Sequence, residues 1–169
     1  RYFLLNKNTL WLEFHCEQNE YLEATAREDV WHTGQRPFGY TNLTDFLERR
    51  KAPKHRAHIA DLLREYGCET LDGYLNVAHA LSLNDTLWVK QAGSALTWAD
   101  VSLYRNPFNE VISEAAFDGS INSSGFSSTS PEISTDGQYA KCWVRENDTV
   151  QLYKTGSVFG MEPLSEFLA

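Results

Sequence analysis

The sequence YAKCWVRENDTVQLYK, residues 139–154, contains two runs of apolar and aromatic residues on either side of the polar stretch Glu146-Asn147-Asp148. Asn and Asp favour tight turns, and aromatic and β-branched residues favour strands, so this sequence predicts an antiparallel β-hairpin. Lys154 stands where the second strand ends. The preceding residues, 119–137, are rich in serine and almost free of aliphatic side chains, which predicts a mobile loop and not a buried element.

Two more regions lie before this loop. In residues 1–40, apolar residues flank a turn at Asn6-Lys7-Asn8, and a third extended piece follows, which predicts a small β module. Residues 41–118 carry apolar residues at helical spacing, with Pro53 and Gly67 as stop signals, and predict a helical accessory segment. The stretch 97–100, TWAD, resembles a helix capping box. We therefore expect an α+β protein in three parts, 1–40, 41–118 and 119–169.

Composition and charge exclude several classes of protein. Of the 169 residues, 42% are hydrophobic and 22% charged, which is typical of folded domains and not of disordered or collagen-like chains. No apolar stretch approaches the roughly 20 residues of a membrane helix, and no signal peptide is evident, so we expect a cytoplasmic protein without a membrane partner. A net charge of −8 disfavours nucleic acid as a direct partner. The three cysteines are far apart and predict neither a disulfide framework nor a metal site.

The order of elements at the C-terminal end is that of a protein-kinase N-lobe. In kinases a flexible loop covers the nucleotide phosphates, a lysine on the sheet contacts them, and a glutamate on the next helix pairs with that lysine. Here a Ser-rich loop is followed by a hairpin that ends in Lys154, and then by a helix start at Pro163 with glutamates around it. The pattern alone is also typical of a plain linker followed by a solvent-exposed lysine.

Several stretches resemble HipA-like bacterial Ser/Thr kinases, and they occur in the order of that family. They are YFLLNKN (2–8), RPFGY (36–40), FLERRKAPKHR (46–56), LSLNDTLWV (81–89), LTWADVSLYRNPF (96–108), FSSTSPEISTDGQYAKCW (126–143), VQLYKTGS (150–157) and EPLSEFLA (162–169). The resemblance implies a partial, truncated kinase N-lobe that begins near residue 119 and follows an accessory module. In toxin–antitoxin systems such kinases act on a protein substrate and bind an antitoxin-like regulator, so these are the implied partners, their identity unknown.

The resemblance also implies roles for single residues. Lys154 resembles the lysine that contacts the nucleotide, and Glu166 resembles the glutamate that pairs with it, with Glu162 the weaker choice. Residues 127–137 resemble the loop that covers the phosphates, in which a serine of HipA proteins is autophosphorylated. The implied residues of that loop are Ser128, Ser130, Ser134 and Gly137.

Catalysis needs groups that lie elsewhere in this family. The resemblance places the residue that orients the substrate hydroxyl, and the ligands of Mg, in a C-terminal lobe beyond Ala169. The chain ends about two turns into its last helix, so we expect a fragment that is inactive alone, with no catalytic residue and no metal ligand of its own. ATP and Mg are expected only for the full-length parent.

A second hypothesis of another class is a non-enzymatic regulatory or DNA-binding module centred on residues 42–67. Its basis is a basic run that spans two predicted helices and so resembles a surface that docks on a DNA backbone. The competing interpretation is a solvated helix end, where cations are favoured by the helix dipole. The run consists of Arg49, Arg50, Lys51, Lys54, His55, Arg56 and His58.

Overall fold

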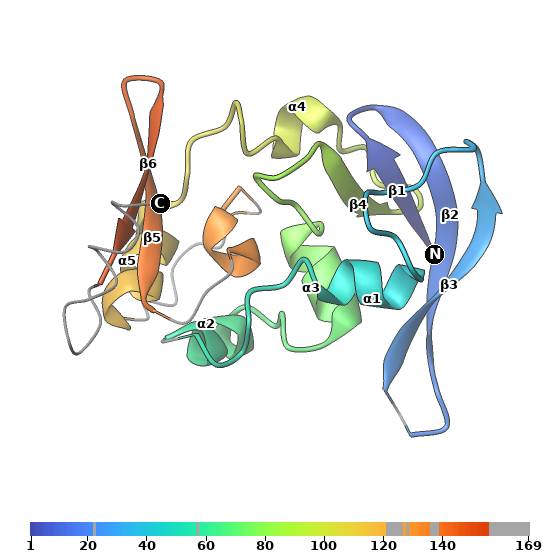
Figure 1. The fold of residues 1–169 in the computed structure, drawn as a ribbon, viewed down its shortest axis with the longest axis horizontal. Coiled ribbons are helices and arrows are strands. Elements are labelled where there is room, and N and C mark those ends of the chain that lie inside the picture. The colour runs from blue at the N-terminus through green and yellow to red at the C-terminus, as the bar shows by residue number, and fades with distance from the viewer. Residues whose placement is uncertain (22, 57, 121–126, 128, 136–138, 156–169) are drawn as a thin grey trace.

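The computed structural model describes the whole chain except residues 22, 57, 121–126, 128, 136–138 and 156–169. The described residues form an α+β structure, as expected. A four-stranded antiparallel sheet lies at one end of the described part, a two-stranded hairpin lies at the other, and helices lie between them (Figure 1).

The sheet begins with the predicted N-terminal hairpin. Strand β1 (Tyr2–Asn6) pairs antiparallel with β2 (Thr9–Gln18) through a turn in which Lys7 has a φ of 52°. β3 (Ala24–Trp31) pairs with β2, and β4 (Leu87–Gln91) pairs with the other edge of β1. The sheet order is therefore β3-β2-β1-β4, and its last strand comes from far along the chain.

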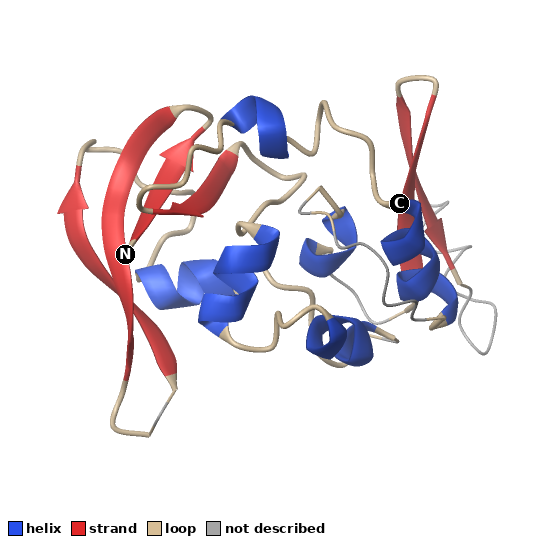
Figure 2. Ribbon diagram, turned by 180° about the vertical axis from the view of Figure 1, so that it is seen from behind, coloured by secondary structure: helices blue, strands red, loops and turns tan. Residues whose placement is uncertain are grey.

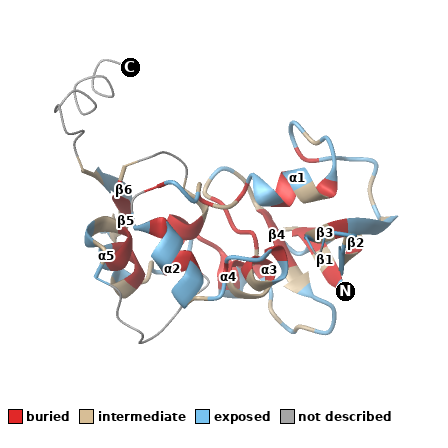
Figure 3. Cartoon of the chain, turned by 90° about the horizontal axis from the view of Figure 1, so that it is seen from below, coloured by how far each residue is buried: buried red, intermediate tan, exposed pale blue. Residues whose placement is uncertain are grey.

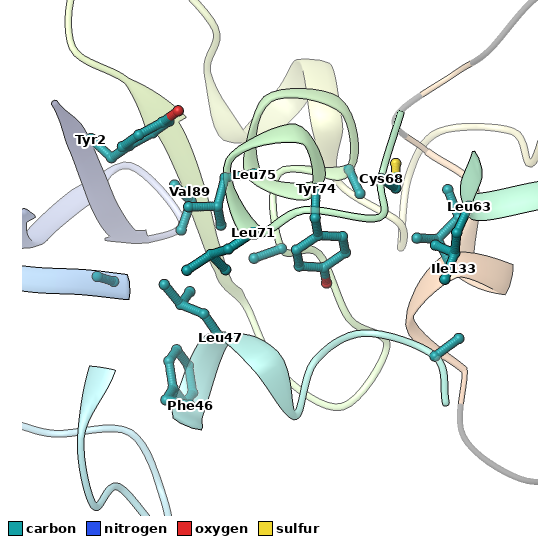
Figure 4. Close-up of a cluster of buried hydrophobic side chains, with 14 of the residues drawn as sticks. Tyr2, Phe46, Leu47, Leu63, Cys68, Leu71, Tyr74, Leu75, Val89 and Ile133 are labelled. Carbon is teal, nitrogen blue, oxygen red and sulfur yellow. The ribbon is translucent and has the colours of Figure 1, made fainter. Parts of the chain in front are cut away.

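Helices cover both faces of the sheet. α1 (Leu43–Glu48), α2 (Ile59–Glu65) and α3 (Leu71–Ala78) supply one face of the main core, in which Leu47, Leu71 and Tyr74 pack with Val89 of β4 (Figure 4). Trp88 points to the opposite face, where α4 (Trp98–Val101) completes a second cluster. This alternation follows from the two-residue period of a strand. The distribution of buried segments is shown in Figure 3.

The helix ends form as their sequences indicate. Asn42 accepts a hydrogen bond from the Asp45 backbone N–H at the start of α1. At α4, Thr97 and Asp100 form the predicted capping box. In α3, a Cβ on Gly73 would lie 2.0 Å from the Gly67 carbonyl oxygen, so only glycine fits there.

The prediction of an unburied loop over residues 119–137 is wrong for part of that stretch. After α5 (Glu110–Asp118), residues Pro131–Ser134 form a 3-10 helix, η1, and residues 129–133 are buried. Ile133 enters the main core, and its carbonyl accepts a hydrogen bond from the Ala52 N–H at 2.6 Å. The segment is buried because Ile133 packs into the main core. The serine content of the segment gives no indication of this packing.

Candidate functional site

The C-terminal hairpin forms as predicted. β5 (Lys141–Glu146) pairs antiparallel with β6 (Thr149–Lys154), and the turn residues Asn147 and Asp148 have φ angles of 47° and 64°. Positive φ at both central residues is typical of a type I′ hairpin turn, which Asn and Asp tolerate better than most residues. Lys154 therefore lies at the open end of the hairpin.

Lys154 lies directly opposite Lys141 in the register of this hairpin. At Trp143, two residues along β5, the backbone N–H and C=O bond to side chains outside the hairpin, so Trp143 belongs to a non-hydrogen-bonded pair. Such pairs alternate along a ladder, and the two lysines form the next one, in which side chains approach most closely. Lys141 is only 3% exposed and Lys154 is half-buried. Two lysine side chains therefore start from facing positions at this end of the hairpin.

Two side chains hold the outer edge of β5. Glu132 of η1 accepts a hydrogen bond on Oε1 from the Trp143 backbone N–H at 3.0 Å. The Ser113 hydroxyl of α5 lies 2.9 Å from the same oxygen and 3.1 Å from the Trp143 carbonyl oxygen. These groups take the place of a neighbouring strand, so they fix β5 against η1 and α5 (Figure 2).

The end of η1 contacts the same face of the hairpin that carries the two lysines. Alternate residues of a strand share a face, and directly paired residues do too, so Trp143 lies on the face of Lys141 and Lys154. The Trp143 indole N–H donates to Thr135 Oγ1 at 2.7 Å. Thr135 is thus held on the lysine face.

Glu132 is a buried acid in an unusual setting. It has no exposed surface, and its Oε2 has no hydrogen-bond partner among the described residues. Burial raises the pKa of the Glu132 carboxyl, against the opposing effects of the Trp143 N–H, the Ser113 hydroxyl and the Arg56 cation. Arg56 donates to the backbone carbonyls of Glu132 and Thr135, at 2.7 and 2.8 Å, and so binds η1 to the turn before α2.

The candidate serines have different environments. Ser130 is 5% exposed, so its hydroxyl is not presented at the surface. Ser134 is half-buried, and its hydroxyl donates to the Pro131 carbonyl at 3.2 Å. Ser130 precedes η1 and Ser134 ends it, and η1 packs against β5, the strand paired with the one that carries Lys154. Ser128, Gly137 and Glu166 lie outside the described residues.

Two residues of the basic run are buried and not solvated. Arg50 is 8% exposed and makes a two-pronged ion pair with Asp85, at 2.7 and 2.9 Å, and it also donates to two backbone carbonyls. Arg56 is 2% exposed and is bound to η1. Both cations therefore serve internal contacts, and neither is presented to a DNA backbone.

Sequence reasoning missed Lys141, Ser113 and Glu132. The register was available for Lys141, because counting outward from Asn147-Asp148 places it opposite Lys154. No such signal exists for Glu132, an acid between a proline and an isoleucine in a serine-rich stretch. The hydrogen bond that connects it to Ser113 spans 19 residues of sequence.

Comparison with protein-family models, with curated proteins and with solved structures gives no match. Within the described residues, no group of three or more His, Cys, Asp or Glu side chains is placed to hold a metal ion. No helix in the described part of the chain is long and apolar enough to cross a membrane.

Proposed function

We propose that this chain is the N-terminal portion of a HipA-like Ser/Thr kinase, in which the β5–β6 hairpin presents Lys154 to the phosphates of ATP. The observation that carries the proposal is the position of Lys154, which faces Lys141 at the open end of the hairpin. The sequence resemblance in FSSTSPEISTDGQYAKCW and VQLYKTGS supplies the kinase assignment.

The two lysines suit a phosphate chain on electrostatic grounds. A lysine ammonium is a compact cation with three donors, and it contributes most to phosphate binding where water is partly excluded. Lys141 is buried and Lys154 is half-buried, so both are partly shielded from water. A phosphate bound at both lysines would contact the two strands of the hairpin together, so nucleotide binding would also stabilise the hairpin.

The position of η1 supports a role in covering the nucleotide. Thr135, at the end of η1, accepts a hydrogen bond from the Trp143 indole N–H on the lysine face of the hairpin, so the described end of η1 lies beside this face. The proposal makes residues 127–137 the phosphate-covering segment. Ser130 is buried, so its modification by a kinase would require residues 129–133 to leave the core.

The sequence resemblance assigns the ligands of Mg and the phosphoryl-transfer groups to a C-terminal lobe of the parent protein. In kinases Mg neutralises the phosphate charge that develops during transfer, and it is held by carboxylate and amide oxygens. No candidate cluster of this kind occurs among the described residues. The proposal accordingly gives this chain the positioning of the nucleotide.

The test is nucleotide affinity of the full natural chain, measured with a fluorescent ATP analogue in the presence of Mg. We expect Lys154→Ala to weaken binding at least about tenfold, and Lys141→Ala to weaken it as well, because each removes one cation from a charge-assisted contact. Lys54→Ala is the matched control: Lys54 is exposed, lies outside the hairpin, and its loss changes the net charge by the same amount. Unchanged affinity in Lys154→Ala would refute the role of this lysine.

A further inference from the structure

A groove lies between α5 and the outer edge of β5, on the opposite side of β5 from β6. Its volume is about 330 Å³. Much of its lining is apolar, and four of the lining residues, Phe108, Phe117, Trp143 and Val144, are only half-buried. The groove is large enough for one or two bulky side chains of a ligand.

Three carboxylates follow one rim of this groove. Glu110, Glu114 and Asp118 lie four residues apart on α5, all three line the groove, and all three are exposed. A helix rises 1.5 Å per residue, so the row extends about 12 Å along the helix axis. Hydrogen bonds from the side chain and backbone of Ser120 lower the pKa of Asp118, so this carboxylate is ionised near neutral pH.

The acidic row opposes the stability of its own helix. Like charges four residues apart destabilise a helix by about 0.2–0.5 kcal/mol per pair. Asp118 is also the last residue of α5, where the helix dipole favours a cation. The helix dipole favours Glu110 in the first turn of α5, and Ser120 donates to Asp118, but neither effect removes the repulsion among the three carboxylates. A cationic partner would compensate for this repulsion.

The opposite rim does not neutralise the row. Arg145 donates to the carbonyls of Leu103 and Tyr104, at 2.5 and 3.1 Å, and its guanidinium lies 4.7 Å from the centre of the Phe108 ring. It is thus directed to the segment before α5, and the charge of the groove lining remains negative.

The groove does not accept an added β-strand at its centre. The backbone N–H and C=O of Trp143 on the outer edge of β5 are already bonded to Glu132 and Ser113. A partner must therefore bind through side chains, which favours a helix laid beside α5 over a strand. Residues four apart on such a helix repeat at the spacing of the acidic row.

We infer that this groove binds a basic amphipathic helix of a partner protein, with an apolar anchor between α5 and β5 and with Lys or Arg side chains on Glu110, Glu114 and Asp118. The inference does not depend on nucleotide binding at Lys154. A row of about 12 Å is longer than a small organic cation, and carboxylates repel nucleic acid, so a peptide is the occupant that fits both the length and the charge.

The test uses two synthetic 15-residue helical peptides labelled with fluorescein. Both carry leucine and tryptophan on one face, and one carries lysine at three positions four apart where the other carries glutamate. Fluorescence anisotropy should show the lysine peptide binding at least about tenfold more tightly, with an affinity that falls as salt is added. Equal affinities, or no binding of either peptide, would overturn the inference.

Variants of the protein distinguish peptide binding in this groove from non-specific attraction of a cationic peptide to an acidic chain. We expect Glu110→Gln/Glu114→Gln to weaken binding of the lysine peptide about tenfold, because each ion pair at the rim contributes up to about a factor of five in affinity. Glu20→Gln/Glu65→Gln is the matched control, with the same charge change on exposed residues outside the groove. Phe117→Ala should also weaken binding. If both double variants bind alike, the attraction is non-specific and the inference fails.

A second copy of the chain is the other occupant to exclude. Sedimentation of the protein alone should give a monomer. If the protein instead self-associates, and Glu110→Gln/Glu114→Gln abolishes that association, the groove binds a second copy of the chain and not a partner helix, and the inference is overturned. Glu114→Lys should raise the thermal midpoint, since it replaces two repulsive pairs with two attractive ones, and should abolish peptide binding. A lowered midpoint would mean that the row serves folding, contrary to the inference.

Discussion

Replacing Glu132 with alanine tests how the hairpin is held to the rest of the molecule. Oε1 of this buried acid accepts the Trp143 backbone N–H at 3.0 Å and lies 2.9 Å from the Ser113 hydroxyl. Without it, Ser113 still reaches the Trp143 carbonyl at 3.1 Å, but the Trp143 N–H loses its acceptor. An unsatisfied buried donor costs about 1–3 kcal/mol and the lost side-chain volume about 1–2 kcal/mol, so Glu132→Ala should destabilise the protein by about 2–5 kcal/mol near pH 5.

The size of this effect depends on pH. Burial raises the pKa of Glu132 in the folded protein, so above the unfolded value of about 4.3 the folded state binds more protons than the unfolded state. The contribution of Glu132 to stability is therefore greatest below this value, and it falls as the pH rises through the folded pKa. The alanine variant lacks this dependence, so its deficit relative to the native protein should be smaller near pH 8 than near pH 5.

Glu132→Gln is the matched control, because glutamine has the shape of the protonated acid and keeps an oxygen for the Trp143 N–H. Near pH 5 its free energy of unfolding should lie within about 1 kcal/mol of that of the native protein, and near pH 8 it should be the more stable of the two. The measurement is urea unfolding followed by tryptophan fluorescence from pH 5 to 8. Parallel pH profiles for the native protein and Glu132→Gln, or a loss below about 1 kcal/mol in Glu132→Ala near pH 5, would refute the reasoning.

Three further substitutions test other parts of the fold by the same unfolding measurement. Arg50→Lys should cost about 2–4 kcal/mol, because lysine cannot keep the two-pronged bond to Asp85 together with two backbone bonds; a loss similar to that of an exposed arginine would contradict this. Asp100→Ala should cost about 1 kcal/mol through the capping box with Thr97, and a neutral result would mean that α4 does not depend on its cap. Burial lowers the pKa of His79, so the native protein should lose stability as the pH falls below about 6.5, and His79→Asn should lose less; equal losses would assign the effect to another group.

Local structure could be predicted from neighbouring residues. The turns at Asn6-Lys7-Asn8 and at Asn147-Asp148, the strands beside them and the capping box at Thr97 all formed where the sequence indicated. These features depend on backbone preferences and on side chains a few residues apart, so a short window of sequence contains their causes. The same reasoning placed Lys154 at the exit of a hairpin.

Burial and partners across the chain could not be predicted in this way. The sequence around Arg50 is that of an exposed basic helix end, yet the side chain is buried because Asp85, 35 residues later, provides its counter-ion. Serine content indicated a loop at residues 129–133, yet these residues are buried. Ile133 packs in the main core, and Glu132 bonds to the outer edge of β5. Local sequence thus determines the turns, strands and helix caps. Only the tertiary structure decides the position of β4 in the sheet, the burial of these charges and the groove beside α5. The reason is that desolvation and pairing depend on neighbours in space, which come from distant parts of the chain.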